Sequence, residues 1–389
     1  MIYLDNSATT CLCEGAKEGL ELSVCHFANP SSLHKAGNEA KALISKAELE
    51  IYEALGIRAL PTPSHKLIFT SCGTESNNLA LMGVINAKNR RFLPRIITTD
   101  SEHPSVLEPL SHLEEQKRAE VIRLSTKGGR IDRKELEEAI NERTVLVSIM
   151  QVNNETGAIY DIKGLFAAAK AKKADVITHT DMTQGFLKLE STLNLRTACV
   201  DLVTVSGHKV HAPKGVACLA IKQELIKKRA ISPIMLGGGQ GGGLRSGTEN
   251  VMGIVSLGKA CKEGLGIMKN GGYAHFEKCR KAFTDELDPS VRVNIPLCVA
   301  PHIISVTLPG IKSQTMLSHL SSKEIYVSSG SACSSHGGHK SYVLRAFGLT
   351  PEEADCTIRI SLSHYNTETE LQTAAKEINL AVSKLVRIN

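Results

Sequence analysis

The chain has 389 residues, which is enough for one large domain or two of medium size. Its 46 Lys and Arg against 40 Asp and Glu give a formal charge of +6, and because these charges are scattered we expect no nucleic acid partner. A composition of 42% hydrophobic and 22% charged residues excludes a mostly disordered chain. No apolar stretch approaches the roughly 18 residues of a membrane helix, so we expect no membrane span.

Two further features of the sequence concern the cellular compartment. The N-terminal sequence has no pattern typical of a secretory or transit signal. The 11 Cys contain no CxxC pair, which opposes a disulfide framework. We therefore expect a cytoplasmic protein.

Helical patterns alternate with short apolar runs through the first two thirds of the chain. The first expected helix is 35–55, where apolar residues recur every three or four positions and form one stripe. Seven runs are rich in Val and Ile without strict polar alternation, which is typical of strands covered on both faces. These runs span 66–70, 95–100, 119–124, 145–152, 176–181, 202–207 and 215–221. Further helices are expected at 131–140, with Asp132 as N-cap and Glu135 at capping-box spacing, and at 161–174.

This alternation indicates an α/β fold with a mostly parallel seven-stranded sheet. After about residue 258 the strand signals become sparse, and a helix-rich stretch leads to a few short strands and a terminal helix at 367–386. We therefore expect a large α/β domain at 15–258, which would bind the ligand, and a smaller α+β domain made of 1–14 and 259–389. In open α/β sheets the ligand site lies beyond the carboxyl ends of the strands.

Two motifs at such ends suggest a lysine amine and a phosphate site. In SGHKVHAPKG, Lys209 lies beside the donors Ser206 and His208, a setting that suits an amine forming a Schiff base, although a lone loop lysine is usually solvated. In SCGTESNN, Gly73 and Thr74 would open a helix whose N-terminal N–H groups bind phosphate. An ordinary helix start capped by Thr74 is the alternative.

Two more candidate residues lie at or just after the ends of predicted strands. Asp181 is suited to pairing with a protonated ring nitrogen, or it is a turn residue that ends its strand. His103 also follows a strand, although a lone histidine is more often structural. Together the motifs predict a pyridoxal phosphate site, which needs a Schiff-base lysine, a carboxylate at the pyridinium nitrogen and a phosphate cup.

The order of the motifs resembles the cysteine desulfurases of the nitrogen-fixation and iron–sulfur-cluster type. The matching segments are DNSATT, NPSSLH, TSCGTESNN, SEHPSV, QVNNETG, HTDMTQ, SGHKVHAPKG, GGGQ with LRSGTEN, SSGSACSS and IRISLS, and they run from Asp5 to about Leu362. The resemblance implies the fold of class V (fold type I) pyridoxal phosphate enzymes and a homodimer. It also implies L-cysteine as substrate and an iron–sulfur scaffold or another protein as sulfur acceptor.

The resemblance also assigns residues to the cofactor. Lys209 would form the Schiff base, Asp181 would pair with the ring nitrogen, and His103 would stack on the ring and move protons. Gln184 and Asn154 would bind the ring hydroxyl and the substrate side. The residues expected to hold the phosphate are Gly73, Thr74, Ser206, His208 and, from the second subunit, Thr248.

For the substrate, the resemblance assigns Arg359 to its carboxylate, with Asn29 nearby, and Cys333 as the nucleophile that takes the sulfur as a persulfide. Cys333 lies among Gly and Ser, which predicts an exposed thiol on a long loop of the smaller domain. Relatives often carry Glu–Arg where this chain has Gly241 and Gly242, which puts a usual salt bridge in doubt. They often carry Tyr–Gly at His211–Ala212, so altered contacts around Lys209 are expected.

Other functions remain open at this point. Selenocysteine lysis would use the same residues, whereas transamination would not need Cys333. Cys333, His336 and His339 have a spacing that is able to ligate zinc, but a fourth ligand is not evident and we expect no metal. The GGGQGGG segment lacks the Lys-Ser/Thr ending of a phosphate-binding P-loop.

Overall fold

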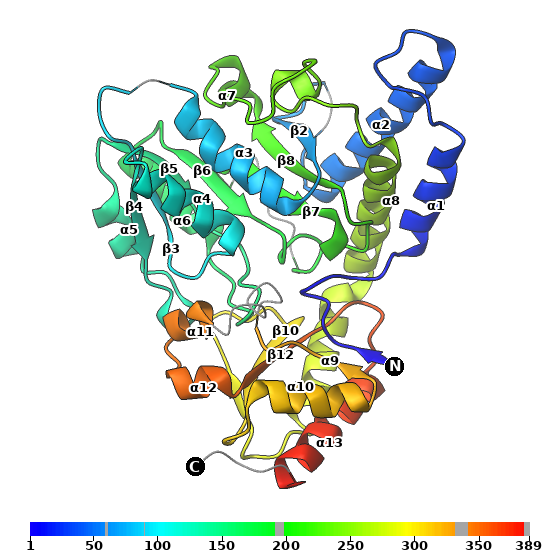
Figure 1. Cartoon of the computed structure of the whole chain (residues 1–389), viewed down its shortest axis with the longest axis vertical. Coiled ribbons are helices and arrows are strands. Elements are labelled where there is room, and N and C mark those ends of the chain that lie inside the picture. The colour runs from blue at the N-terminus through cyan, green and yellow to red at the C-terminus, as the bar shows by residue number, and fades with distance from the viewer. Residues whose placement is uncertain (59–60, 89, 191–197, 331–340, 385–389) are drawn as a thin grey trace.

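The computed structural model describes residues 1–58, 61–88, 90–190, 198–330 and 341–384 (Figure 1). Its main sheet has seven strands in the order β2-β8-β7-β6-β5-β3-β4. Their bounds are β2 (His65–Thr70), β3 (Arg95–Thr99), β4 (Glu120–Leu124), β5 (Thr144–Ser148), β6 (Ile177–Asp181), β7 (Leu202–Ser206) and β8 (Ala217–Lys222). All neighbours are parallel except that β8 is antiparallel to β7 and β2. The predicted mostly parallel, seven-stranded α/β sheet is thereby confirmed.

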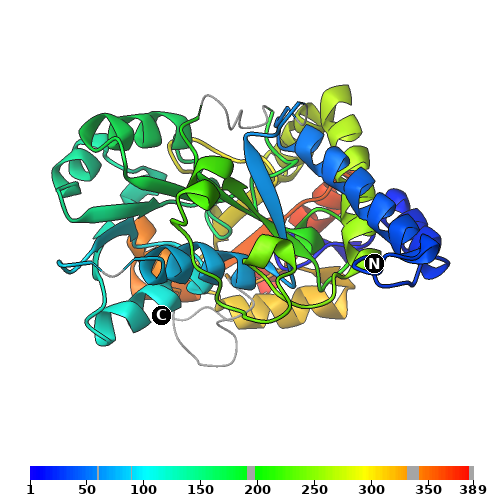
Figure 2. The same cartoon turned by 90° about the horizontal axis from the view of Figure 1, so that it is seen from above.

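Helices cover both faces of this sheet, and the layers are visible in Figure 2. Alternate strand residues belong to separate cores: Leu67 packs in one, and Ile68 packs in the other. This two-sided burial explains why the strands are near-continuous apolar runs. On one face lie α3 (Gly73–Asn86), α4 (Pro104–Glu115) and α7 (Gln223–Lys227). On the other lie α2 (Lys35–Ala54), α5 (Arg133–Ala139), α6 (Ile162–Lys172) and α8 (Val251–Ile267), with α1 (Glu14–Val24) packed on α8.

The remaining elements form a second core below the main sheet in Figure 1. Its strands are β9 (Arg292–Asn294), β10 (Ile303–Thr307) and β12 (Thr357–Ser361), which are antiparallel, and β1 (Ile2–Tyr3), which is parallel to β11 (Ile325–Tyr326). Its helices are α9 (Tyr273–Thr284), α10 (Ser313–Ser322) and α13 (Glu368–Lys384), with α11 (Tyr342–Phe347) and α12 (Pro351–Asp355) beside them. Short helical turns are η1 (Lys127–Gly129), η2 (Gly207–Lys209), η3 (Gly241–Gly243) and η4 (Met268–Gly272).

The N-terminal strand therefore joins the C-terminal part of the chain, and Leu4 belongs to its core. The division into 15–258 against 1–14 and 259–389 stays a prediction, which the two separate cores support. Its boundary falls inside α8, which continues past residue 258 to Ile267. Among the described residues, no helix is both long and apolar enough to cross a membrane.

Two expected helix starts differ in detail. Asp132 caps α5 as predicted, but the Glu135 carboxylate accepts a hydrogen bond from the Ser125 N–H, at 3.2 Å, and α5 has no capping box. At α3 the N-cap position is Cys72, one residue before Gly73, and it makes no side-chain cap bond. Thr74 is thus inside the first turn of α3 and does not cap it.

Candidate active site

A cavity of about 230 Å³ opens at the carboxyl ends of the central strands. Asp181 ends β6 and Ser206 ends β7, while α3 begins just after β2 on the same edge of the sheet. The predicted site residues that line the cavity are Gly73, Thr74, His103, Asn154, Asp181, Gln184, Ser206, His208, Lys209 and Arg359. Asn29 and Thr248 are exposed and do not line it. Cys333, His336 and His339 lie outside the described residues.

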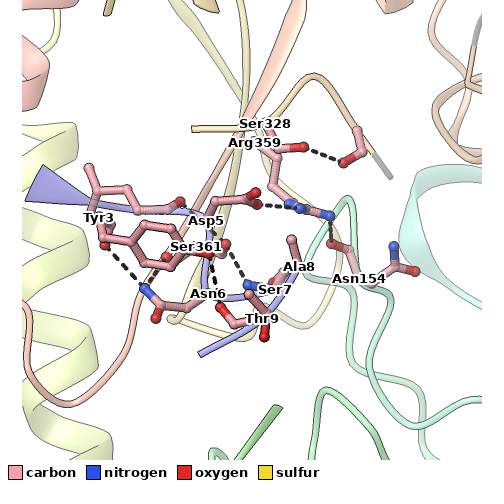
Figure 3. A network of polar contacts seen from close by, with 12 residues as sticks. Tyr3, Asp5, Asn6, Ser7, Ala8, Thr9, Asn154, Ser328, Arg359 and Ser361 are labelled. Atoms are coloured by element: carbon pink, nitrogen blue, oxygen red, sulfur yellow. Dashed lines mark hydrogen bonds and ion pairs between the residues drawn. The ribbon is translucent and has the colours of Figure 1, made fainter. Parts of the chain in front are cut away.

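Lys209 points toward the N-terminal segment. Its ammonium Nζ donates to the carbonyl oxygen of Ala8, at 2.6 Å, and to that of Ser7. The segment is itself fixed against β12, because the Ser7 N–H donates to Ser361 Oγ at 2.8 Å and Asn6 Nδ2 donates to the Ser361 carbonyl at 3.0 Å (Figure 3). The DNSATT motif thus positions the amine among the residues that line the cavity.

The Asp181 carboxylate is held by two donors. Asn77 Nδ2 donates to its Oδ2 at 2.9 Å, and the Thr183 N–H donates to its Oδ1 at 2.9 Å. Asn77 also donates to Ser105 Oγ at 2.8 Å, so the carboxylate is linked to the start of α4. Asp181 is 8% exposed and lines the cavity, so its carboxyl group is held in one orientation there.

His103 is the N-cap of α4. Its Nδ1 accepts from the Ser105 N–H at 3.1 Å, which leaves the proton of the neutral ring on Nε2. Burial lowers the pKa of His103, and the charge of Lys209 adds to that effect while Asp181 opposes it. The ring is therefore a neutral imidazole at pH 7, which is able to take up a proton.

The first turn of α3 forms a cradle with Ser206 and His208. A Cβ at Gly73 would lie 3.3 Å from Ser206 Cβ and 3.7 Å from Thr183 Oγ1, so a side chain here would narrow the space between α3 and Ser206. Burial and the charge of Lys209 lower the pKa of His208 to about 4, so it is a neutral partner for an anion. An uncapped helix start, a hydroxyl and a nearby ammonium group suit a phosphate. The cradle, Asp181 and Lys209 thus fit the three attachment points of pyridoxal phosphate.

Arg359 lies on β12 and is 2% exposed. Its Nη1 donates to the Asn154 carbonyl oxygen at 3.0 Å, and its Nη2 pairs with Asp5 Oδ1 at 2.7 Å (Figure 3). Buried Arg359 Nε has no partner among the described residues. The guanidinium is therefore oriented by two contacts and keeps donor capacity for a further acceptor such as a carboxylate.

The glycine-rich loop keeps an ion pair in spite of Gly241 and Gly242. Arg245 Nε pairs with Glu75 Oε1 of α3 at 2.8 Å. A Cβ at Gly242 would collide with Lys66 Nζ. Gly242 has a φ of +67°, a backbone conformation that favours glycine, and the loop is anchored through Arg245.

Sequence reasoning missed several residues that shape the cavity. Ser7 and Ala8 receive Lys209, Asn77 and Thr183 hold Asp181, and Ser105 contacts both Asn77 and His103. All of them lie inside motifs that carry the resemblance, so the resemblance could have identified them as site residues. Among the described residues, no group of three or more His, Cys, Asp or Glu is placed to hold a metal ion.

The fold and the site together define a pyridoxal phosphate enzyme of fold type I. The model of the Aminotransferase class-V family matches residues 2–373. A cysteine desulfurase of Trichormus azollae is 35% identical over 398 residues, which cover 99% of this chain and 94% of that protein. Among solved structures, a NifS-like protein has a TM-score of 0.89 at 34% identity and covers 99% of this chain and 100% of that one. The structure titled SspA in complex with cysteine has a TM-score of 0.79 at 30% identity, with 94% of this chain and 100% of that chain covered.

This chain belongs to the class V aminotransferase family, and the predicted resemblance to the cysteine desulfurases is confirmed. Pyridoxal phosphate is the cofactor of this family, and the cofactor prediction is confirmed with it.

Proposed function

We propose that this chain is a cysteine desulfurase, which converts L-cysteine to L-alanine and holds the sulfur as a persulfide on Cys333. The observation that carries the proposal is the full-length similarity to cysteine desulfurases, 35% identity over 99% of the chain. The cavity adds to it, because the residues expected to bind cofactor and substrate carboxylate line one space.

Pyridoxal phosphate, when bound, supplies an electron sink for the negative charge that develops on the substrate Cα as its proton is lost. Lys209 is the residue that would hold it covalently, with Nζ directed by the Ser7 and Ala8 carbonyls. Asp181 would face the ring nitrogen, and its contacts with Asn77 and Thr183 keep the carboxylate from turning away.

The remaining residues act on the substrate. Arg359 would bind the carboxylate of cysteine, since its guanidinium is buried and already oriented. His103 is neutral and hydrogen-bonded through Nδ1, so it is suited to move a proton at Nε2. The Cys333 thiolate would take the sulfur, so that an S–S bond forms as the C–S bond of cysteine breaks.

We also propose that the enzyme works as a homodimer and passes sulfur to an acceptor protein, such as an iron–sulfur scaffold. Thr248 is exposed and does not line the cavity of its own chain, which suits a residue that completes the phosphate site of a second copy. The role of Asn29 beside the substrate stays a prediction. Sedimentation of the active enzyme tests the dimer, and an active monomer would contradict it.

The function is tested by incubating the purified holoenzyme with L-cysteine and measuring alanine together with the mass of the peptide that contains Cys333. We expect one alanine per sulfur and a persulfide on that peptide. The control is Cys333→Ser, which should keep the cofactor absorbance but form no persulfide. Turnover of selenocysteine with no turnover of cysteine, or undiminished persulfide formation by Cys333→Ser, would overturn the proposal.

A further inference from the structure

Lys188 is a buried lysine that the proposed reaction does not use. It lies in the segment after β6 and is 6% exposed. No ion pair of the described residues includes it, and its Nζ donates to Gln184 Oε1 at 3.0 Å. Because lysine is almost never buried without a partner, this contact has to compensate for the loss of hydration. Such a cost indicates a role beyond packing.

The contact fixes the orientation of a cavity residue. Gln184 Nε2 donates to the Ser7 carbonyl oxygen at 3.0 Å. If the side-chain amide were flipped, its own oxygen would face the Ser7 carbonyl oxygen, which is unfavourable. Lys188 thus occupies the acceptor side of the amide, and Ser7 occupies one of its two N–H groups. The second N–H remains for the cavity, where Gln184 lies with Lys209. The same Ser7 carbonyl receives Lys209, so the two lysines are linked through one amide and one carbonyl.

We propose that Lys188 is a positioning residue of the cofactor site, which acts through Gln184 by holding its side-chain amide with Nε2 toward Ser7 and the cavity. The proposal rests on the cofactor site and not on the identity of the substrate. Gln184 itself is further fixed because its backbone carbonyl accepts from His302 Nε2 at 2.9 Å. Only rotation of its side chain is left for Lys188 to control.

The strength of the hydrogen bond between Lys188 and Gln184 depends on pH. Burial and the charges of Lys209 and Arg359 lower the pKa of Lys188 to about 7. The groups that face it from η2, β12 and the neighbouring loops are Lys209, Arg359, His208, His211, His302 and His364. Glu263 lines the same small inner cavity as Lys188, but its carboxylate already accepts from the Gly15 N–H and the Tyr365 hydroxyl. An ammonium donor forms a stronger hydrogen bond than a neutral amine, so the hold on Gln184 weakens as pH rises through 7.

The test is the dissociation constant of pyridoxal phosphate, measured by titrating it into the apo form of each full-length variant at pH 6 and at pH 8.5. Lys188→Met keeps an unbranched apolar side chain as far as the Cε position and removes the Nζ donor. We expect about tenfold weaker binding at pH 6 and a smaller loss at pH 8.5. In a Gln184→Ala background, Lys188→Met should cause no further loss at either pH, since its effect passes through that amide.

Two variants separate this role from folding. Lys170→Met also removes a partly buried ammonium, which pairs with Asp201, but Lys170 does not line the cavity, so its affinity for the cofactor should equal that of the wild type. Lys188→Gln retains a neutral donor and is available if Lys188→Met does not fold. The ratio of its dissociation constants for the cofactor at pH 8.5 and pH 6 should be smaller than the same ratio for the wild type. Affinity of Lys188→Met within twofold of wild type at both pH values, or an equal loss in the Gln184→Ala background, would overturn the proposal. Failure of the wild type to bind pyridoxal phosphate would instead contradict the proposed function.

Discussion

Asp5 Oδ1 and Arg359 Nη2 lie 2.7 Å apart and join the first residues of the chain to strand β12 (Figure 3). The Arg359 side chain is 3% exposed and that of Asp5 is 21% exposed, so the pair is largely removed from water. The residue proposed to bind the substrate carboxylate therefore already has a carboxylate beside it. Asp5 both orients the guanidinium and reduces the positive charge that a substrate meets.

Replacing Asp5 by Asn should separate these two effects. The amide oxygen still accepts from Arg359 Nη2, but the competing negative charge is gone. We expect a KM for cysteine several-fold lower, with little change in kcat, and a loss of stability of about 1 kcal/mol because the buried guanidinium is no longer neutralised. Steady-state kinetics and thermal unfolding measure both, and a raised KM would contradict the competition.

Asn77→Ala should remove one of the two hydrogen bonds that hold the Asp181 carboxylate. The substitution removes the donor 2.9 Å from Asp181 Oδ2 and leaves a cavity at a site only 1% exposed. We expect roughly tenfold weaker binding of pyridoxal phosphate, since a lost hydrogen bond to a charged group costs about 1.5–3 kcal/mol. Asn78→Ala is the control, because Asn78 Nδ2 donates to the Thr74 backbone carbonyl and its side chain does not line the cavity. Equal affinities of the two variants would argue against a role for Asn77.

Gly73→Ala should fill the phosphate cradle. Its new methyl group would lie 3.3 Å from Ser206 Cβ, which is a tight contact at the start of α3. The variant should fold normally and bind the cofactor about tenfold more weakly, a cost of roughly 1.4 kcal/mol. Gly266→Ala in α8 is the matched control, since a Cβ there meets nothing within 4 Å. That control should keep cofactor affinity and gain up to about 1 kcal/mol of helix stability. Unchanged affinity in Gly73→Ala would remove the cradle from the site.

Glu102, next to His103 in sequence, should make stability depend on pH. Burial raises the pKa of its carboxyl group from 4.5 to about 8, and its Oε2 has no partner among the described residues. The folded state thus holds a proton that the unfolded chain releases above pH 4.5, so stability is lost as pH rises from there through 8. The slope for one such group reaches about 1.4 kcal/mol per pH unit.

Glu102→Gln should remove this dependence. The amide oxygen still accepts from Thr99 Oγ1 and the Met150 N–H, as Glu102 Oε1 does. Urea unfolding should show that the free energy of unfolding of the variant, relative to that of the wild type, is larger at pH 9 than at pH 6. Identical pH profiles for the two proteins would show that Glu102 is not protonated in the fold.

The fold was predictable because its signals are local. Two-sided burial of strands such as β7 leaves a continuous apolar run, and the stripe of α2 repeats with the helical period. Lys209 and Asp181 were predictable because Asp181 ends such a strand and Lys209 lies in the turn after one.

What the sequence could not provide are contacts between distant segments. Asp5 and Arg359 are 354 positions apart, and the Ser7 carbonyl meets Lys209 from 202 positions away. No periodicity reports which backbone carbonyl an amine reaches. The partner of Glu135 shows the same limit, because its spacing fits a capping box whereas the folded chain offers the Ser125 N–H.

The proposed function depends on a covalent bond between Lys209 and pyridoxal phosphate. It is tested most directly by reducing the purified holoenzyme with borohydride and locating the cofactor by peptide mass spectrometry. We expect a single pyridoxyl group on the peptide that contains Lys209. Attachment to Lys188, the buried lysine that contacts Gln184, or no attachment at all, would contradict it.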